Sequence, residues 1–264
     1  QAAEEESLFY KINFRLGRLY EVMQENKNSI TKEQSDLQEL ISDISHQVKT
    51  PIANLKIINS TLMEQDVPAQ KQKEFLAAQA GQLDKLDCLM QAMIKTSRLE
   101  AGVISLEKKE QPIYYTLAAA LGGILLGAEK KQIDVQVDCP EHLEACHDRK
   151  WTGEALFNIL DNAVKYTPPG STVQVSLFRE GDQVVLTVED NGAGIPEEDL
   201  PRIFERFYRV DKARSRAAGG TGLGLAIVRD TVEKRGGTVE AANRPGGGAV
   251  FTVRWPWREG GGQT

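Results

Sequence analysis

The chain has 264 residues, of which 41% are hydrophobic and 27% charged, and its formal net charge is −6. This composition excludes a disordered chain, and the length allows two domains that each bury a core. The negative balance offers no basic surface, which argues against nucleic acid as a partner. The three cysteines, Cys88, Cys139 and Cys146, lack metal-ligand spacing, so we expect free thiols in a reducing, cytosolic compartment.

The first quarter of the chain carries apolar residues at alternating spacings of three and four. This pattern predicts one long helix, or two in tandem, over residues 7–62. The stripe changes frame near Ile44, which is either a stutter that alters coiled-coil winding or an imperfect heptad without consequence. Its downstream part consists of Ile41, Ile44, Val48, Pro51, Leu55, Ile58 and Leu62.

His46 falls at heptad position f, which points furthest from the apolar seam. A histidine there contributes nothing to helix packing and is free to meet a partner in solvent. Pro51 follows, and a proline in a helix interior costs about 3 kcal/mol because it lacks the N–H group and crowds the preceding turn. Helix formers resume at Ala53, which favours a kink over a stop. On these residues alone, a surface histidine beside a helix end is an equal alternative.

Residues 64–72 contain Pro68 and interrupt the pattern, so they predict a turn. A second helix follows, with a stripe made of Leu76, Gln79, Leu83, Leu86, Met90, Met93 and Ser97. Two antiparallel helices cannot bury both stripes alone, whereas two such hairpins can form a four-helix bundle, so we predict a homodimer. Residues 98–109 lose the periodicity around Gly102, which predicts a linker with a short strand at 103–106.

From about residue 110 the pattern changes to mixed helices and strands. We expect helices over residues 113–130, 148–166 (capped by Asp148) and 222–235. We expect strands over residues 133–138, 173–179, 183–189, 238–242 and 249–255. Helices on one face of a mostly antiparallel sheet form an α/β sandwich. Residues 111–128 carry no charge, but their proline, tyrosines and glycines favour a core helix over a membrane span.

Three polar or glycine-rich motifs follow one another in this half. Asn158 and Asn162 lie four residues apart on one helical face, with Lys165 and Tyr166 a turn further on; oxygen ligands for Mg2+ and a cation for phosphate would explain them. Asp190 ends a strand beside two glycines that let a flat ligand approach. Residues 219–225 are glycine-rich and lead into a helix, whose N-terminal N–H groups favour phosphate. In this order the three motifs indicate a nucleotide site.

Five motifs together resemble those of bacterial sensor histidine kinases. They are HQVKTP (residues 46–51), the phosphoacceptor box, and the nucleotide-binding boxes NILDNAVKY (158–166), DNGAG (190–194), FERFYR (204–209) and GTGLGL (220–225). They occur in family order, and the match runs from about residue 35 to 256. The gyrase ATPase domain shares the nucleotide boxes but lacks the histidine helix.

The resemblance implies an α+β fold. An N-terminal helical hairpin would form a dimeric four-helix bundle, followed by an α/β sandwich ATP-binding domain of the histidine kinase/gyrase type. The implied domains are a signalling helix (1–34), a dimerisation and histidine phosphotransfer domain (35–102), an ATP-binding catalytic domain (103–258) and a tail (259–264). The chain would be the cytoplasmic part of a protein anchored in the bacterial plasma membrane by an N-terminal sensor region.

The resemblance also implies roles for single residues toward ATP and Mg2+. Asn162 would ligate Mg2+, with Asn158 supporting metal or phosphate; Lys165 would meet the phosphates, Tyr166 would flank the adenine, and Asp190 would accept from its exocyclic amine. The glycines would shape the base pocket (Gly192, Gly194) and close the phosphate end (Gly220, Gly222, Gly224). Residues 197–221 would form a lid to which Arg209 contributes positive charge.

The implied activity is autophosphorylation of His46, followed by transfer to an aspartate of a cognate response regulator. The family usually has an acidic residue after the histidine, and here Gln47 can fix the imidazole tautomer but cannot take its proton, which predicts slower autophosphorylation. Thr50 matches the position associated with dephosphorylating the regulator. Two rivals are a kinase-dead dimeric scaffold that acts mainly as a phosphatase, and a bare ATPase, which leaves the histidine helix unexplained.

Overall fold

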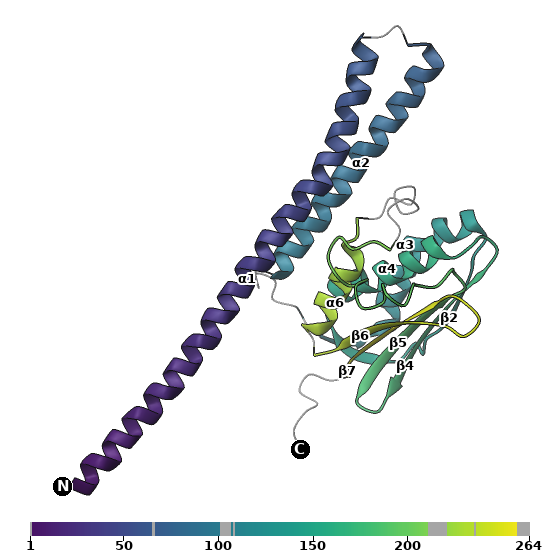
Figure 1. Cartoon of the computed structure of the whole chain (residues 1–264). Helices are drawn as coiled ribbons and strands as arrows, with labels where there is room; N and C mark the ends of the chain where they lie inside the picture. The colour runs from purple at the N-terminus through teal and green to yellow at the C-terminus, as the bar shows by residue number, and fades with distance from the viewer. Residues whose placement is uncertain are drawn as a thin grey trace. The chain divides into compact units, whose positions relative to one another are not determined.

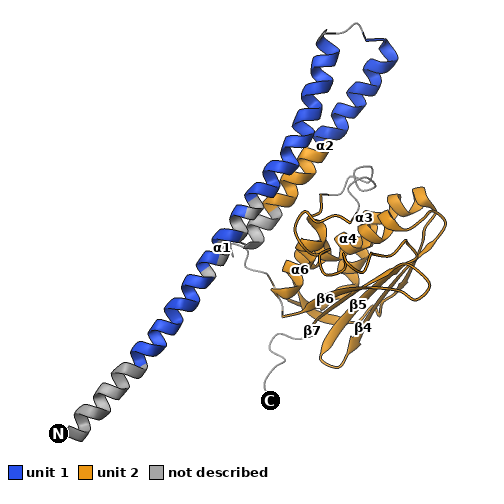
Figure 2. Ribbon diagram, viewed as in Figure 1, with its two compact units in different colours: residues 1–83 blue, residues 84–264 orange. Residues whose placement is uncertain are grey.

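The structure is a computed structural model, and it describes residues 2–64, 67–100, 107, 109–210, 221–234 and 236–257. The chain divides into two compact units, Gln1–Leu83 and Asp84–Thr264 (Figure 2). The division falls inside a helix, so it does not mark a functional boundary. The predicted functional boundaries at residues 34, 102 and 258 stay predictions.

The first unit is built on one long helix. Helix α1 spans Ala2–Glu64 and continues through Pro51, so the prediction of a helix over residues 7–62 is confirmed and a helix end at Pro51 is excluded. Helix α2 spans Ala69–Glu100. It starts earlier than the predicted turn at 64–72 allows, because the Gln72 N–H already bonds the Pro68 carbonyl at 3.0 Å and the Gln72 side chain bonds the Val67 carbonyl at 3.0 Å.

Large apolar side chains remain exposed along this hairpin. On α2, Leu76, Leu83 and Met90 follow one another at intervals of seven residues, and each is more than half exposed. Leu86 of the same predicted stripe is half-buried, and Leu89, which the stripe does not include, is buried. The predicted stripe of α2 is therefore split into a half-buried row and an exposed row. Other exposed apolar residues of the hairpin include Leu16, Leu19, Met23, Ile30, Ile41, Ile57 and Met63.

The second unit contains a five-stranded sheet in the order β2-β4-β5-β7-β6 (Figure 1). The strands are β2 (Asp134–Asp138), β4 (Thr172–Glu180), β5 (Gln183–Asp190), β6 (Thr238–Asn243) and β7 (Ala249–Pro256). Only the β2–β4 pair of this sheet is parallel. Helices α3 (Ile113–Lys131), α4 (Arg149–Tyr166) and α6 (Gly224–Glu233) cover one face, which confirms the predicted α/β sandwich.

The core of this unit lies between those helices and the sheet. Strand β7 alternates between buried and half-buried residues, as expected for a strand with one face against helices. From α4, Leu156, Ile159 and Leu160 are fully enclosed. The Asp148 carboxylate accepts the Trp151 N–H at 3.0 Å, so the predicted cap of α4 is confirmed.

A second, two-stranded sheet is absent from the sequence-based prediction. Strand β1 (Lys109–Pro112) pairs antiparallel with β3 (Glu144–His147). Both strands are four residues long and lack apolar alternation, so no local pattern marks them. The strand predicted at 103–106 lies outside the described residues.

His147, at the end of β3, is fully buried. Its Nε2 lies 2.8 Å from the Thr116 hydroxyl and its Nδ1 lies 2.9 Å from the Ala145 carbonyl oxygen. Both ring nitrogens therefore have protein partners, and this histidine ties α3 to β3. Helix α3 holds most of the uncharged run at 111–128, yet no helix in the described part of the chain is long and apolar enough to cross a membrane.

Candidate functional site

The last two turns of α4 present the first group of predicted residues. Asn158 and Asn162 are half-buried on this helix, and Tyr166, its last residue, is exposed. The Asn158 amide nitrogen donates to the Glu154 carbonyl at 2.9 Å, which leaves its amide oxygen turned away from that bond. Lys165 pairs with Asp161 at 2.6 Å. The four predicted side chains thus occupy one end of one helix.

That end of α4 is held by Lys131, the last residue of α3. Its ammonium group donates to three carbonyl oxygens, those of Val164 (2.8 Å), Lys165 (2.6 Å) and Thr167 (3.2 Å). Carbonyls at a helix C-terminus lack partners within the helix, and a cation there also matches the helix dipole. Lys131 therefore fixes the backbone that carries Lys165 and Tyr166. No local sequence signal marks Lys131, because basic residues in a last helical turn are common.

Asp190 ends β5 and is only 5% exposed. Its Oδ1 accepts the N–H groups of Gly192 at 2.8 Å and Ala249 at 3.1 Å. Within the described residues, no donor reaches its Oδ2. A β-carbon on Gly192 would lie 2.9 Å from the Tyr166 carbonyl oxygen, so the missing side chain lets this loop touch the end of α4. Asp190 and Tyr166 are thereby brought together from separate elements.

Two of the glycines predicted to close the phosphate end contact two other motifs. Gly222 has a φ of +75°, and a β-carbon there would lie 2.8 Å from the Phe207 backbone, whose N–H bonds the Gly222 carbonyl at 2.9 Å. A β-carbon on Gly224, the first residue of α6, would lie 3.0 Å from the Asn158 side-chain oxygen. The segment 204–209, the glycine motif and α4 therefore meet. Gly220 lies outside the described residues.

Arg209 is half-buried at the end of this segment. One residue earlier, the Tyr208 hydroxyl donates to the Asp199 carboxylate, and the Arg202 guanidinium lies 4.3 Å from the Tyr208 ring centroid. The hydrogen bond to Asp199 raises the pKa of Tyr208 above its ordinary value, with burial adding to the effect. These contacts fix the start of the segment predicted to act as a lid.

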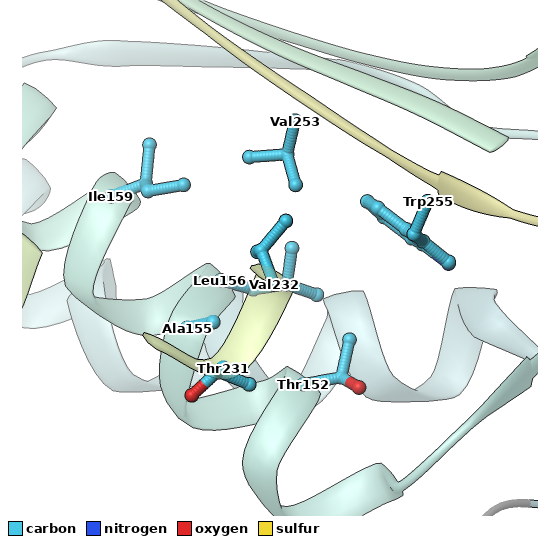
Figure 3. Close-up of a pocket in the computed structure, with 8 residues that line it drawn as sticks. All are labelled: Thr152, Ala155, Leu156, Ile159, Thr231, Val232, Val253 and Trp255. Atoms are coloured by element: carbon cyan, nitrogen blue, oxygen red, sulfur yellow. The ribbon is translucent and has the colours of Figure 1, made fainter. Parts of the chain in front are cut away.

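A small cavity of about 20 Å3 lies elsewhere, between α4, α6 and β7 (Figure 3). Apolar side chains line most of it, and Thr152 and Thr231 add the only hydroxyl groups of its lining. A volume of this size holds about one water molecule, so the cavity cannot hold a nucleotide. None of the predicted nucleotide-binding residues lines it.

His46 lies in the other unit, on the solvent-exposed side of α1. Thr50, one turn later, is also exposed, and its hydroxyl donates to the His46 carbonyl at 3.4 Å. Gln47 is half-buried. The structure therefore offers the imidazole and the Thr50 hydroxyl to solvent on one helix, as the heptad position predicts.

Comparison with known proteins adds the family. Residues 147–259 match the model described as "Histidine kinase-, DNA gyrase B-, and HSP90-like ATPase". Sensor-like histidine kinase SenX3 of Mycobacterium tuberculosis is 32% identical over 218 residues, which are 83% of this chain and 53% of SenX3. The chain thus spans about half the length of this relative.

Solved structures agree with the fold. The catalytic domain of histidine kinase ThkA matches 57% of this chain and 96% of its own, with a TM-score of 0.52 and 27% identity. ThkA in complex with the response regulator protein TrrA matches 86% of this chain and 64% of its own, with a TM-score of 0.67 and 22% identity. Since the ATPase family, the named relatives and the motif order all agree, the chain belongs to the family of bacterial sensor histidine kinases.

Proposed function

We propose that this chain uses ATP to phosphorylate His46 and then passes the phosphoryl group to an aspartate of a response regulator. One observation carries the proposal: the same chain holds both an exposed histidine in a phosphoacceptor motif and a nucleotide-site candidate. In the second unit, the motifs that resemble ATP-binding boxes come together at one end of α4. The relatives are named as histidine kinases, and one solved neighbour is in complex with a response regulator.

The residues around Asp190 fit an adenine nucleotide. The Asp190 Oδ2 can accept from the exocyclic amine, since its Oδ1 already accepts two backbone N–H groups. The exposed Tyr166 ring can flank the base, and Lys165 can exchange Asp161 for phosphate oxygens. Other residues proposed to contact or enclose the nucleotide are Gly192, Gly194, Arg209, Gly220, Gly222 and Gly224.

The two asparagines fit Mg2+. The Asn158 amide nitrogen donates to the Glu154 carbonyl, which leaves its oxygen as a ligand, and the Asn162 amide lies one turn further on. Mg2+ prefers a few protein oxygens together with phosphate oxygens and waters, so neutral amides suffice. When bound, the ion would neutralise charge on the phosphates. We therefore assign Asn162, with Asn158 in support, as the metal residues.

The chemistry at His46 is in-line phosphoryl transfer, which depends on positioning and charge neutralisation. The Nε2 lone pair forms the new N–P bond as the bond from the γ-phosphorus to the ADP oxygen breaks. The reacting form is the neutral imidazole that carries its proton on Nδ1 and its lone pair on Nε2. The Gln47 amide oxygen can hold the Nδ1–H group and select this tautomer, but it cannot take the proton.

The hairpin supports a homodimer. The exposed row through Leu76 and Leu83 needs a cover, and a second hairpin supplies one by forming a four-helix bundle. The same bundle would present His46 and Thr50 to the response regulator, and Thr50 would support phosphatase activity toward it. By the same resemblance, we propose that a sensor region anchors the natural protein in the plasma membrane, with these residues on the cytoplasmic side.

Labelling with γ-phosphate-labelled ATP and Mg2+ tests the proposal. The unaltered chain should acquire acid-labile label, and His46→Ala should acquire none. If the unaltered chain stays unlabelled yet speeds dephosphorylation of a phosphorylated regulator, the kinase-dead scaffold is correct, an alternative that Gln47 favours. If ATP is hydrolysed equally by both proteins without labelling, the chain is a bare ATPase.

A further inference from the structure

The turn between β6 and β7 lies against the end of β5. Strand β7 begins beside that end, because Val250 pairs with Glu189, and Asn243 of β6 pairs with Ala249. The approach is very close: a β-carbon on Gly248, where φ is +90°, would lie 1.9 Å from the Asp190 carbonyl oxygen. The turn therefore touches the backbone of the residue proposed to read the base.

The Asn243 side chain both accepts a hydrogen bond from the loop after Asp190 and donates one to it. Its side-chain oxygen accepts the Ile195 N–H at 2.8 Å, and its amide nitrogen donates to the Ile195 carbonyl at 2.6 Å. A β-carbon on Gly194, where φ is +73°, would lie 2.9 Å from the same side-chain oxygen. A single side chain thus replaces a missing strand partner and fixes the far end of the glycine loop.

Arg244 bonds the near end of the same loop. One terminal nitrogen, Nη1, donates to the Asn191 side-chain oxygen at 2.7 Å and to the Asp190 carbonyl at 3.2 Å. Its Nε pairs with Glu189 at 3.0 Å. The guanidinium therefore spans three consecutive residues, of which Asp190 is the middle one. The planar, forked guanidinium group can make these three contacts at once, whereas the ammonium group of a lysine cannot.

Together these contacts determine where the Asp190 carboxylate points. Its Oδ1 accepts one N–H from the glycine loop, Gly192, and one from the first residue of β7, Ala249. If the loop and the turn shift against each other, one of these two donors is lost and the carboxylate can rotate. Because both fixed N–H donors bind Oδ1, the other carboxylate oxygen, Oδ2, stays available to accept a hydrogen bond from the ligand.

We infer that Asn243 and Arg244 are positioning residues that set the base preference of the nucleotide site. The inference rests on the proposed function, because it assumes that Asp190 reads the exocyclic amine of adenine. Guanine carries an oxygen at that position and gains nothing from the carboxylate. A buried hydrogen-bonding group held in place rejects a ligand without its complement, and a loosened one discriminates less. The two residues touch Asp190 and its loop rather than the base.

The test compares ADP and GDP binding to the full 264-residue chain by titration calorimetry. Asn243→Ala and Arg244→Met should each raise the Kd for ADP by about tenfold, on the scale of one lost hydrogen bond, and leave the weak GDP binding unchanged. The KM for ATP in the labelling assay should rise while kcat is retained. Arg244→Lys should behave like Arg244→Met, since the charge alone does not restore the fork.

Arg254→Met is the matched control. Arg254 lies on the same strand pair and bonds Glu240 at 3.5 Å, away from the loop, so its loss should leave the ratio of ADP to GDP affinity unchanged. A merely structural role of the turn would lower the unfolding midpoint of the Arg244 variants without changing that ratio.

The outcomes separate the two proposals. If Asp190→Asn abolishes the preference for ADP but Asn243→Ala and Arg244→Met keep it, the positioning role is wrong. Asn243→Asp keeps the acceptor and loses the donor, so it should also weaken ADP binding. Full ADP affinity in this variant would contradict the claim that both hydrogen bonds to Ile195 are needed. If the unaltered chain binds no ADP, the proposed function itself fails.

Discussion

The hairpin and the ATP-binding unit differ in how they treat apolar surface. In the hairpin, Leu76 and Leu83 leave more than half of their side-chain surface in solvent, whereas Leu160 and Val173 of the second unit are completely enclosed. The second unit covers its sheet with its own helices, and the described part of the hairpin has no such cover over this row. One region is therefore complete as a single copy, and we expect the other to need a second chain.

The core variant Leu160→Ala should have the largest effect. Its side chain is fully buried between α4 and the sheet, so its truncation should cost about 3 kcal/mol of unfolding free energy. Urea unfolding, followed by a signal from the second unit, measures the loss. The control Leu126→Ala, on the exposed side of α3, should change stability by less than about 0.5 kcal/mol. If both variants lost the same unfolding free energy, the face of α3 that carries Leu126 would have to be covered as well, and the second unit would not be self-contained.

Lys131→Met should have the next largest effect, about 2 kcal/mol, because a charged donor to three helix-end carbonyls is removed. Nucleotide affinity should fall as well, since the end of α4 carries Lys165 and Tyr166. The neighbouring exposed residue provides the control, Lys130→Met. An unchanged unfolding midpoint for Lys131→Met would remove the claim that this side chain holds the helix end.

Leu83→Asp should weaken the dimer by at least about tenfold in Kd, because a carboxylate would have to enter an apolar seam. Analytical ultracentrifugation over a range of concentrations measures this, and ADP binding should persist. Cys88→Asp adds the same charge at an exposed position of α2, about 140° around the helix from Leu83, and should leave the dimer intact. A monomeric unaltered chain would contradict the contrast between the two units.

Thr50→Ala should leave autophosphorylation of His46 in place and remove phosphatase activity toward the phosphorylated regulator. The Thr50 hydroxyl is exposed, and its bond to the His46 carbonyl is long at 3.4 Å, so its loss should not disturb α1. Release of phosphate from the regulator measures the effect. Loss of both activities, or of neither, would contradict this role.

Gln47→Glu should produce the smallest change. A carboxylate can take the proton that the amide cannot, but we propose that Gln47 already selects the tautomer. We therefore expect a severalfold faster initial labelling, well below the roughly 100-fold of full general-base catalysis. A variant no faster than the unaltered chain would show that the residue after the histidine does not limit the rate.

Much of the second unit could be predicted because its signals are local. The strands β4 and β5, the cap at Asp148 and the extent of α3 all follow from alternation, capping chemistry and apolar periodicity within a few residues. The site residues Asn158 and Asp190 could be proposed from the sequence because each belongs to a compact motif.

The missed features depend on contacts between distant residues. Asn243 meets Ile195 across 48 positions, and Arg244 meets Asn191 across 53, so no spacing in the sequence links them. Lys131 likewise bonds the Val164 carbonyl across 33 positions. The early start of α2 was missed because Pro68 suggested a longer turn, although a proline directly before a helix is compatible with its first residues.

Helix α1 is unbroken over 63 residues, which corresponds to about 95 Å at 1.5 Å per residue. Each residue turns by about 100° around the axis, so deleting one residue ahead of His46 would swing the imidazole to another side of the rod. Deleting seven would restore its angular phase to within about 20°. A rotation of the beginning of α1 about the helix axis, carried along the unbroken helix, would therefore turn the His46 imidazole about the same axis. The direction in which this ring faces would then report a signal received at the beginning of the helix.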